Sequence, residues 1–299
     1  MSFLKQFAFV PTGSTTAALI AIIQSITLRL LTEPFVRMIS LDFSKAFDTV
    51  RHSELVSKAS TIIIKDQALN WLISYPAGHS HCTKFAGITS GLSNINASVI
   101  QGSAIGPAAF AIVAADLTPI NPLNDLFKYA DDMYLIVSAS DSMSCVGELN
   151  NIANWAARNN LKLNNSKSKE IIFHHSKRKL SSIFHPPPIT GNEQVTTIKV
   201  LGVTLNSDLR MSKHIDITLT SCSQSLFALK TLRAHGMSYN TICDVYRATT
   251  MAKIIYGSPA WWGFTSAADR QRLEAFVAKS KKMKLYGDND PTISELCAK

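Results

Sequence analysis

The chain has 299 residues, of which 46% are hydrophobic and 17% charged, with a formal net charge of +9. This balance excludes a disordered protein and allows one large core or two smaller ones. Residues 17–31, the longest apolar run, are too few for a bilayer span and include Gln24, Ser25 and Arg29, which excludes a transmembrane helix there. The N-terminus has no small-residue cleavage site, so we expect an intracellular protein with no membrane partner.

Positive charge is concentrated in the second half of the sequence. Residues 161–299 hold 20 Lys and Arg against 10 Asp and Glu, whereas residues 1–160 hold 10 against 11. Concentrated positive charge favours a polyanionic partner, of which nucleic acid is the commonest. An ordinary solvated basic surface is the alternative. The five cysteines are scattered without a C-x-x-C pair, which indicates neither a disulfide framework nor a zinc site.

Taken in chain order, the first half alternates helices and strands. Residues 14–34 begin with Ser and Thr able to cap a helix and continue with apolar residues at helical spacing as far as Pro34. Further patterns predict a strand at residues 35–43, short helices at 51–60 and 65–75, a hairpin at 81–101, a helix at 104–117, and a strand, turn and strand at 126–137.

The second half becomes helical towards its end. Residues 141–160 predict a helix, with Ser142 as its N-cap and Trp155 facing a core, and residues 161–175 return to extended structure. Three consecutive prolines in a polar setting predict a loop over residues 176–194. A hairpin at 195–208 and helices over 211–286 follow. This order predicts an α+β domain followed by a helical one.

Acidic residues interrupt two otherwise apolar segments. Asp131 and Asp132 lie at the expected hairpin tip in "FKYADDMYLIV", and Asp42 closes a strand in "RMISLDFSKAFDTV". Taken alone, the Asp131–Asp132 doublet is typical of a turn in which the side chains bond to their own backbone. Taken alone, Asp42 is typical of an acidic residue at a helix N-terminus. Together, however, like charges need a neutralising cation. Mg²⁺ takes hard oxygen ligands and shares substrate phosphates, so the pattern predicts a binuclear Mg²⁺ site for phosphoryl transfer.

Five segments occur in the order of the palm motifs of reverse transcriptases. They are "SLDFSKAFDTV", "SVIQGSAIGPAAF", "FKYADDMYLIV", "NWAARNNLKLNNSKSKEIIF" and "KVLGVTLNSDLRMSKHI". The chain resembles most the non-LTR retrotransposon branch of this family, of the jockey-like kind, over about residues 7–216. The resemblance implies an α+β right-hand polymerase with partial fingers, a palm on a βαββαβ-like antiparallel sheet, and a helical thumb.

The resemblance also implies subdomain boundaries. Partial fingers are expected at residues 1–34 and 61–95, the palm at 35–60 and 96–210, and the helical thumb or connection at 211–299. Members of this branch carry a substantial fingers segment before the position of Phe7, which six residues precede here. We therefore expect the chain to be N-terminally truncated.

Matching the motifs residue by residue implies a catalytic set. Asp42, Asp131 and Asp132 match the three metal-binding carboxylates, and the backbone carbonyl of Phe43 is a further expected ligand. Phe47 matches the aromatic steric gate that collides with a ribose 2′-hydroxyl. Without the motif, Phe47 would be interpreted as a core aromatic.

The same matching implies substrate contacts. Gln101 and Gly102 are expected to line the nucleotide and template pocket, and Lys167 matches a lysine suited to protonating the leaving pyrophosphate. Leu201 and Gly202 match the hairpin that supports the primer end. The lysines of "KSKKMK" are expected to follow the sugar-phosphate backbone or, alternatively, to form a solvated helix face.

The function implied is RNA-directed DNA polymerisation, in which a DNA primer is extended with dNTP on an RNA template. The implied cofactor is Mg²⁺, as two ions, with Mn²⁺ as the alternative metal. The expected location is nuclear or cytoplasmic, in a retrotransposon ribonucleoprotein. The expected truncation leaves open a second hypothesis, a catalytically inactive remnant that binds nucleic acid. Copying RNA into RNA is a weaker third hypothesis because of Phe47 and the Y-A-D-D form of the hairpin. The sequence predicts no oligomeric state.

Overall fold

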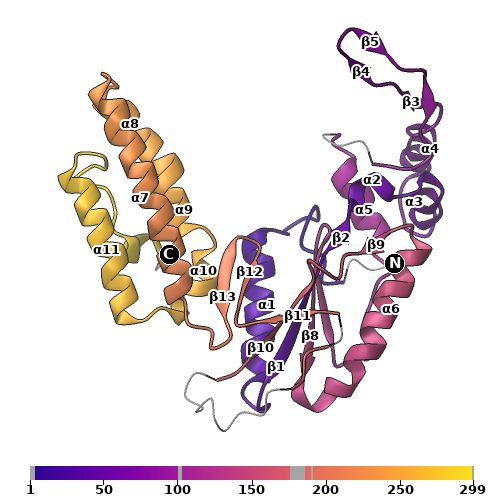
Figure 1. Ribbon diagram of the computed structural model, residues 1–299, viewed down its shortest axis with the longest axis horizontal. Helices are drawn as coiled ribbons and strands as arrows, with labels where there is room; N and C mark the ends of the chain where they lie inside the picture. Colours follow the sequence, from indigo (N-terminus) through magenta and orange to yellow (C-terminus); the bar gives the residue numbers. More distant parts are fainter. Residues whose placement is uncertain (1–3, 100–102, 176–185, 190, 298–299) are drawn as a thin grey trace. The chain divides into compact units, whose positions relative to one another are not determined.

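The computed structural model describes residues 4–99, 103–175, 186–189 and 191–297. The chain mixes helices and strands, as predicted, and divides into two compact units (Figure 1). The first unit consists of Met1–Ser14, Val36–Glu170 and Pro186–Gln194, and the second of Thr15–Phe35, Ile171–His185 and Val195–Lys299. None of the helices in the described ranges is long and apolar enough to cross a bilayer.

The chain forms a five-stranded sheet in the order β11-β10-β1-β8-β7, of which β1, β7 and β8 lie wholly in the first unit. β1 pairs antiparallel with β8, and β8 with β7. On one face of the sheet, apolar side chains of β1 and β8 join a buried core with residues of α3, α5 and α6. The strands are β1 (Val36–Leu41), β7 (Asp125–Tyr129), β8 (Asp132–Ser138), β10 (Lys169–Phe173) and β11 (Glu193–Val195).

The helices of the first unit lie close to their predicted positions. They are α2 (Ala46–Thr49), α3 (His52–Ala59), α4 (Asp66–Ser74), α5 (Gly106–Val113), the 3₁₀ segment η1 (Ala139–Ser144) and α6 (Cys145–Arg158). Trp155 is buried, as predicted. The prediction that Ser142 caps α6 is wrong: Ser142 lies within η1, where its hydroxyl donates to the Ser138 carbonyl. The chain enters α6 through a 3₁₀ turn, so the helix begins at Cys145, two residues later than a Ser142 cap predicts.

The hairpin predicted at residues 81–101 is confirmed over its described part. It consists of two nested antiparallel pairs, β3 with β6 and β4 with β5, and extends away from α4 (Figure 1). Its strands are exposed along their whole length: β3 (Ser80–His81), β4 (Lys84–Phe85), β5 (Ile88–Thr89) and β6 (Ser93–Asn94).

A buried ion pair anchors β1. Arg37 Nη1 donates to Glu170 Oε1 at 2.7 Å, and both side chains are at most 5% exposed. Gln194 Nε2 also donates to Glu170 Oε1, and the Ile189 backbone N–H donates to Oε2. Each carboxylate oxygen of Glu170 is therefore hydrogen-bonded, which offsets the cost of burying its charge, whereas Arg37 Nε has no hydrogen-bond partner among the described residues.

The second unit is mainly helical, as predicted for residues 211–286. Its helix α7 is the longest, and a π-helical segment, η3, joins α8 to α9. Hairpin β12–β13 precedes α7, as predicted. The elements are α1 (Thr15–Arg29), β12 (Thr197–Val200), β13 (Val203–Asn206), α7 (Ser212–Ala234), α8 (Tyr239–Tyr246), η3 (Arg247–Met251), α9 (Ala252–Ile255), α10 (Ser258–Trp261), η4 (Trp262–Phe264), α11 (Ala267–Lys282) and α12 (Ile293–Cys297).

The turn of hairpin β12–β13 requires glycine. Leu201 and Gly202 have φ angles of 44° and 91°, the left-handed pair that a two-residue hairpin favours. A Cβ atom at Gly202 would lie 2.9 Å from Tyr256 Cε1, while Tyr256 Oη donates to the Leu201 carbonyl at 3.0 Å. The turn is therefore held against Tyr256 by both shape and hydrogen bonding.

Replacing Glu170 should reveal how much its buried ion pair with Arg37 stabilises the fold. We expect Glu170→Gln to lower the free energy of unfolding in urea by about 3–5 kcal/mol, because the Arg37 charge stays buried without its counter-charge. The control is Glu193→Gln, which breaks the exposed pair with Lys169 and should cost under about 1 kcal/mol. Equal losses in the two variants would contradict this assignment.

Candidate active site

The pairing of β1 with β8 places the three predicted aspartates at one end of the sheet. The registered pairs end with Leu41 opposite Met133. Asp42 follows Leu41 directly, and Asp132, the first residue of β8, precedes Met133. Because residues on paired antiparallel strands advance in opposite directions, the register brings Asp42 and Asp132 to the same end. Asp131 occupies the turn immediately before β8.

The hairpin that carries Asp131 and Asp132 turns in two residues. Tyr129 pairs with Asp132, which leaves Ala130 and Asp131 as the turn. Ala130 is buried and has a φ of 54°, a left-handed conformation that costs a residue with a Cβ of the order of 1 kcal/mol or more. Strain of this kind persists where the surroundings fix the backbone, so the doublet is held by a rigid turn.

A buried lysine fixes the first strand of this hairpin. Lys128 of β7 is 1% exposed, and its Nζ donates to the carbonyls of Ala114 and Leu117 at 2.8 and 3.0 Å. Burial lowers the Lys128 pKa to about 8, with the Asp116 charge acting in the opposite direction. These bonds connect the hairpin to the chain that follows α5, three residues before Asp131.

Loss of hydration, together with neighbouring carboxylates, raises the pKa of Asp131 and of Asp132. Loss of hydration is the main cause that raises the pKa of Asp131, and the charge of Asp42 adds to it. The pKa of Asp132 rises to about 6 through loss of hydration and then through the charges of Asp131 and Asp42. Asp131 is half-buried, whereas Asp132 retains solvent access at the surface. The three side chains therefore form one negatively charged group that a cation would stabilise.

The short strands β2 (Phe43–Ser44) and β9 (Lys162–Leu163) pair with each other. A polar turn follows β9 and holds the backbone of Asp42. The Asn164 N–H donates to the Asp42 carbonyl at 2.8 Å, and the Asp42 N–H donates to Ser168 Oγ at 3.3 Å. Ser168 is fully buried, and its hydroxyl donates to the Asn164 carbonyl. Lys167 lies in this turn, with an exposed side chain and its N–H bonded to the Asn164 carbonyl.

Sequence reasoning did not identify Asn164 and Ser168 as part of the site. Their signal in the sequence is a polar "NNSKS" turn between two apolar stretches, which by itself predicts a loop. The structure shows that Asn164 and Ser168 of this turn bond to the Asp42 backbone, and Lys167 lies between them in the sequence. Lys167 and Asp42 thus share a local framework, although they are far apart in the sequence.

The two predicted aromatic site residues pack into the core of the first unit. Phe43 is buried, and its ring meets Trp155 edge-on at 6.2 Å. Phe47 is half-buried, lies 4.9 Å from the ring of Phe110, and accepts a backbone hydrogen bond from Val99 N–H. Packing accounts for part of the Phe47 surface and leaves another part accessible. Gln101 and Gly102 lie outside the described residues.

The carboxylates of the three aspartates are ligands of the chemical type that Mg²⁺ takes. Within the described ranges, no three His, Cys, Asp or Glu side chains gather closely enough to hold a metal ion unaided, and none of the three aspartates forms an ion pair with a described residue. Mg²⁺ is commonly held by one or two carboxylates together with waters and substrate phosphates. The carboxylate oxygens of Asp42, Asp131 and Asp132 are hard donors of this type.

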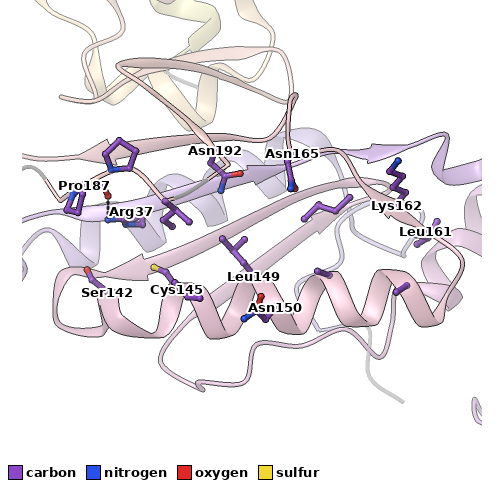
Figure 2. A pocket seen from close by; sticks show the side chains of 16 residues that line it. Arg37, Ser142, Cys145, Leu149, Asn150, Leu161, Lys162, Asn165, Pro187 and Asn192 are labelled. Atoms are coloured by element: carbon purple, nitrogen blue, oxygen red, sulfur yellow. Dashed lines mark hydrogen bonds between the residues drawn. The ribbon is translucent and has the colours of Figure 1, made fainter.

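A cavity of about 690 Å³ lies elsewhere in the first unit. Cys145 and Leu149 of α6 face it from one side, and Arg37, Pro187 and Asn192 from the other (Figure 2). None of the three aspartates lines it. The three aspartates therefore lie outside this cavity.

Comparison with known proteins assigns the family. The model of the family described as "Reverse transcriptase (RNA-dependent DNA polymerase)" matches residues 4–205, and the chain belongs to this family. The RNA-directed DNA polymerase from mobile element jockey of Drosophila funebris is 27% identical over 258 residues, which cover 80% of this chain and 27% of that protein. The probable RNA-directed DNA polymerase from transposon BS of Drosophila melanogaster is 27% identical, over 83% of this chain and 28% of that protein. The chain spans less than a third of the length of these relatives.

Solved structures support the polymerase fold. Telomerase from Candida tropicalis, determined in complex with a fragment of telomeric RNA, gives a TM-score of 0.55 at 13% identity and covers 93% of this chain and 44% of the telomerase chain. Apo telomerase from the same organism gives 0.53 at 14% identity and covers 96% and 53%. At these identities the likeness concerns the fold alone. The predicted resemblance to reverse transcriptases is confirmed at the level of family and coarse fold.

Removing one charge from the acidic group should stabilise the protein in the absence of divalent metal. The folded-state pKa of Asp132 lies above its ordinary value, so the cost of ionising Asp132 in the folded state builds up between about pH 4 and pH 6 and is fully present above pH 6. We expect Asp132→Asn to raise the free energy of unfolding at pH 7.5, with the gain shrinking between pH 6 and 4. Chemical denaturation over this pH range measures it.

The control for this prediction is Asp66→Asn. Asp66 lies in the first turn of α4, where an acidic residue favours the helix, so its removal should lower stability slightly. A loss of stability in Asp132→Asn at pH 7.5, or a gain that persists at pH 3, would contradict the repulsion inferred from the geometry.

Proposed function

We propose that this chain carries the polymerising core of a retrotransposon RNA-directed DNA polymerase, which adds dNTP to a DNA primer on an RNA template. The observation that carries this proposal is the gathering of Asp42, Asp131 and Asp132 at one end of β1 and β8 in a reverse transcriptase chain. The names of the Drosophila relatives support the same activity. The nuclear or cytoplasmic location of a retrotransposon ribonucleoprotein is part of the proposal.

Asp42, Asp131 and Asp132, with the backbone carbonyl of Phe43, would hold two Mg²⁺ or Mn²⁺ ions. Bound ions of this kind lower the pKa of an attacking hydroxyl and stabilise a departing pyrophosphate. The contribution of the chain is to hold three carboxylates together against their repulsion. The rigid turn at Ala130 and the hydrogen bonds around Asp42 support this role, because they fix the backbone on both sides of the group.

Lys167 is the proposed proton donor to the leaving pyrophosphate. Its exposed side chain starts from the turn whose backbone is bonded to Asp42, which supports a position at the edge of the acidic group. Phe47 is the proposed steric gate, packed against Phe110 on one side. A ring supported in this way resists displacement by a ribose 2′-hydroxyl. Gln101 and Gly102 are proposed to line the nucleotide and template pocket.

The proposed subdomains remain partial fingers at residues 1–34 and 61–95, a palm at 35–60 and 96–210, and a thumb at 211–299. Within the thumb, Lys279 and Lys282 are exposed on α11 and available to a sugar-phosphate backbone. Lys281 and Lys284 instead contact the following turn, through the carbonyls of Asp288 and Asp290 and the carboxylate of Asp288 respectively. The first two lysines are therefore the better candidates for nucleic-acid contact.

Primer extension tests the proposed activity. We expect the chain to extend a DNA primer on an RNA template with dNTP and Mg²⁺, and Asp131→Asn to slow extension by at least about 100-fold, the scale on which removing one electrostatic group affects a reaction. Asp66→Asn, which removes a carboxylate of α4, should extend at the wild-type rate. Duplex binding without extension by any of the proteins would instead support the inactive remnant.

The sugar preference tests the role of Phe47. We expect Phe47→Ala to raise the use of ribonucleotides relative to deoxynucleotides by about tenfold or more, because the collision with the 2′-hydroxyl is removed. Competitive single-nucleotide incorporation measures this ratio. A variant that loses activity towards both sugars in proportion would identify Phe47 as a core aromatic alone.

A further inference from the structure

The turn that ends α5, residues 113–117, is bonded to both α3 and α6. Lys58 Nζ of α3 donates to the Val113 carbonyl at 2.6 Å and to Asp116 Oδ1 at 2.7 Å. Trp155 Nε1 of α6 donates to the same carboxylate oxygen at 2.8 Å. Carbonyls at the end of a helix lack intrahelical partners and carry partial negative charge, so a buried ammonium group is a suitable partner for them. These bonds fix the end of α5 against the two neighbouring helices.

Lys128 bonds the same turn to hairpin β7–β8 of the candidate active site. Its Nζ donates to the carbonyls of Ala114 and Leu117, and the residue is 1% exposed. Its main chain is held as well, because its N–H donates to the Lys5 carbonyl and its carbonyl accepts from the Phe7 N–H, both at 2.9 Å. With both ends bonded, this long side chain acts as a spacer of fixed length between the hairpin and α5.

The same helix supports the aromatic ring proposed as the steric gate. Phe110 of α5 is fully buried, and its ring lies 4.9 Å from the ring of Phe47. The Phe110 carbonyl accepts from the Ala114 N–H, and Ala114 is one of the two residues whose carbonyls Lys128 binds. A continuous set of contacts therefore runs from the hairpin through Lys128 and the end of α5 to the Phe47 ring.

We propose that Lys128 is a positioning residue, which holds the hairpin of Asp131 and Asp132 at a set distance from α5 and thereby from the Phe47 ring. The inference rests on the proposed function, because it concerns a nucleotide that meets the aspartates and the steric gate at once. A small shift of the hairpin relative to α5 would spoil that alignment. Lys58 binds the same turn but not the hairpin, so it lies outside this connection.

The ratio of ribonucleotide to deoxynucleotide use tests this role. Loss of folded protein lowers the incorporation of both sugars in proportion and leaves the ratio unchanged, whereas a displaced gate changes it. In single-nucleotide incorporation on an RNA template, we expect Lys128→Met to slow dNTP incorporation by about tenfold or more and to raise the ratio by about threefold or more. Lys128→Arg keeps the cation and its N–H donors and should recover most of the rate and the ratio.

Lys58→Met is the matched control. It removes the other buried ammonium group from the turn at residues 113–117 and leaves the bonds of Lys128 in place. We expect both Met variants to unfold at a lower temperature than the wild-type protein, because each leaves a buried carbonyl without its donor. Only Lys128→Met should change the sugar ratio. An equal rise of the ratio in Lys58→Met would overturn the special role of Lys128.

Hydrogen exchange followed by mass spectrometry tests the connection without any reaction. We expect Lys128→Met to speed exchange in residues 113–117 and 129–133, and Lys58→Met to speed it in residues 113–117 but not in 129–133. If Lys128→Met does not fold, exchange of the wild-type protein in low urea decides. The two segments should then open together, with the same dependence on urea, and separate opening would refute the connection.

The positioning role is overturned if Lys128→Met folds and keeps the wild-type sugar ratio while the wild-type chain extends a primer. Failure of the proposed function gives a different result, in which the wild-type chain extends no primer. The effect of Lys128 on the reaction then fails with it, and the exchange comparison still shows whether Lys128 connects the hairpin to α5.

Discussion

The antiparallel register of β1 against β8 is the constraint on which the acidic site depends. It aligns Leu41 with Met133 and so carries Asp42 and Asp132 to the same end of two buried strands. Shifting the register by one residue would move the apolar side chains of a strand to the opposite face. The core therefore enforces an arrangement that the carboxylates themselves oppose. Folding holds these negative charges together, and this is the condition under which a divalent cation is attracted.

Two local features fix the backbone beside the aspartates. A left-handed Ala130 closes the hairpin in two residues, and a turn anchored by the buried Ser168 binds the backbone N–H of Asp42. Each feature fixes the main chain next to a carboxylate. Side chains held in this way lose little further freedom when metal and substrate bind, which favours a preorganised reaction centre.

The sequence predicts those helices and strands that have a signal in nearby residues. It also predicts the family, because the motifs of that family occur in the expected order along the chain. Periodicity locates α1 and α6, and apolar runs around the aspartate doublet locate β7 and β8. Contacts between distant residues have no comparable signal: Arg37 pairs with Glu170 across 133 positions, and Ser168 meets Asp42 across 126. The sequence of the basic run at residues 279–284 also does not show which of its lysines already form hydrogen bonds or ion pairs within the protein.

The distribution of charge suits the proposed polymerase. Acidic residues that attract cations gather in the first unit, whereas the basic excess of the sequence lies in residues 161–299, most of which belong to the second unit. A metal-dependent enzyme acting on nucleic acid needs both kinds of surface. Their separation along the chain allows each to be altered by mutation without changing the other.

The central claim, that Asp42, Asp131 and Asp132 together hold divalent metal, is tested most directly by metal-directed backbone cleavage. Fe²⁺ substituted for Mg²⁺ generates hydroxyl radicals that cut the chain near the bound ion. With dNTP and a primer duplex present, the account predicts cuts near residues 42 and 131 that excess Mg²⁺ suppresses and that Asp131→Asn weakens. Cuts elsewhere, or cuts at these positions that are equally strong in the variant, would contradict it.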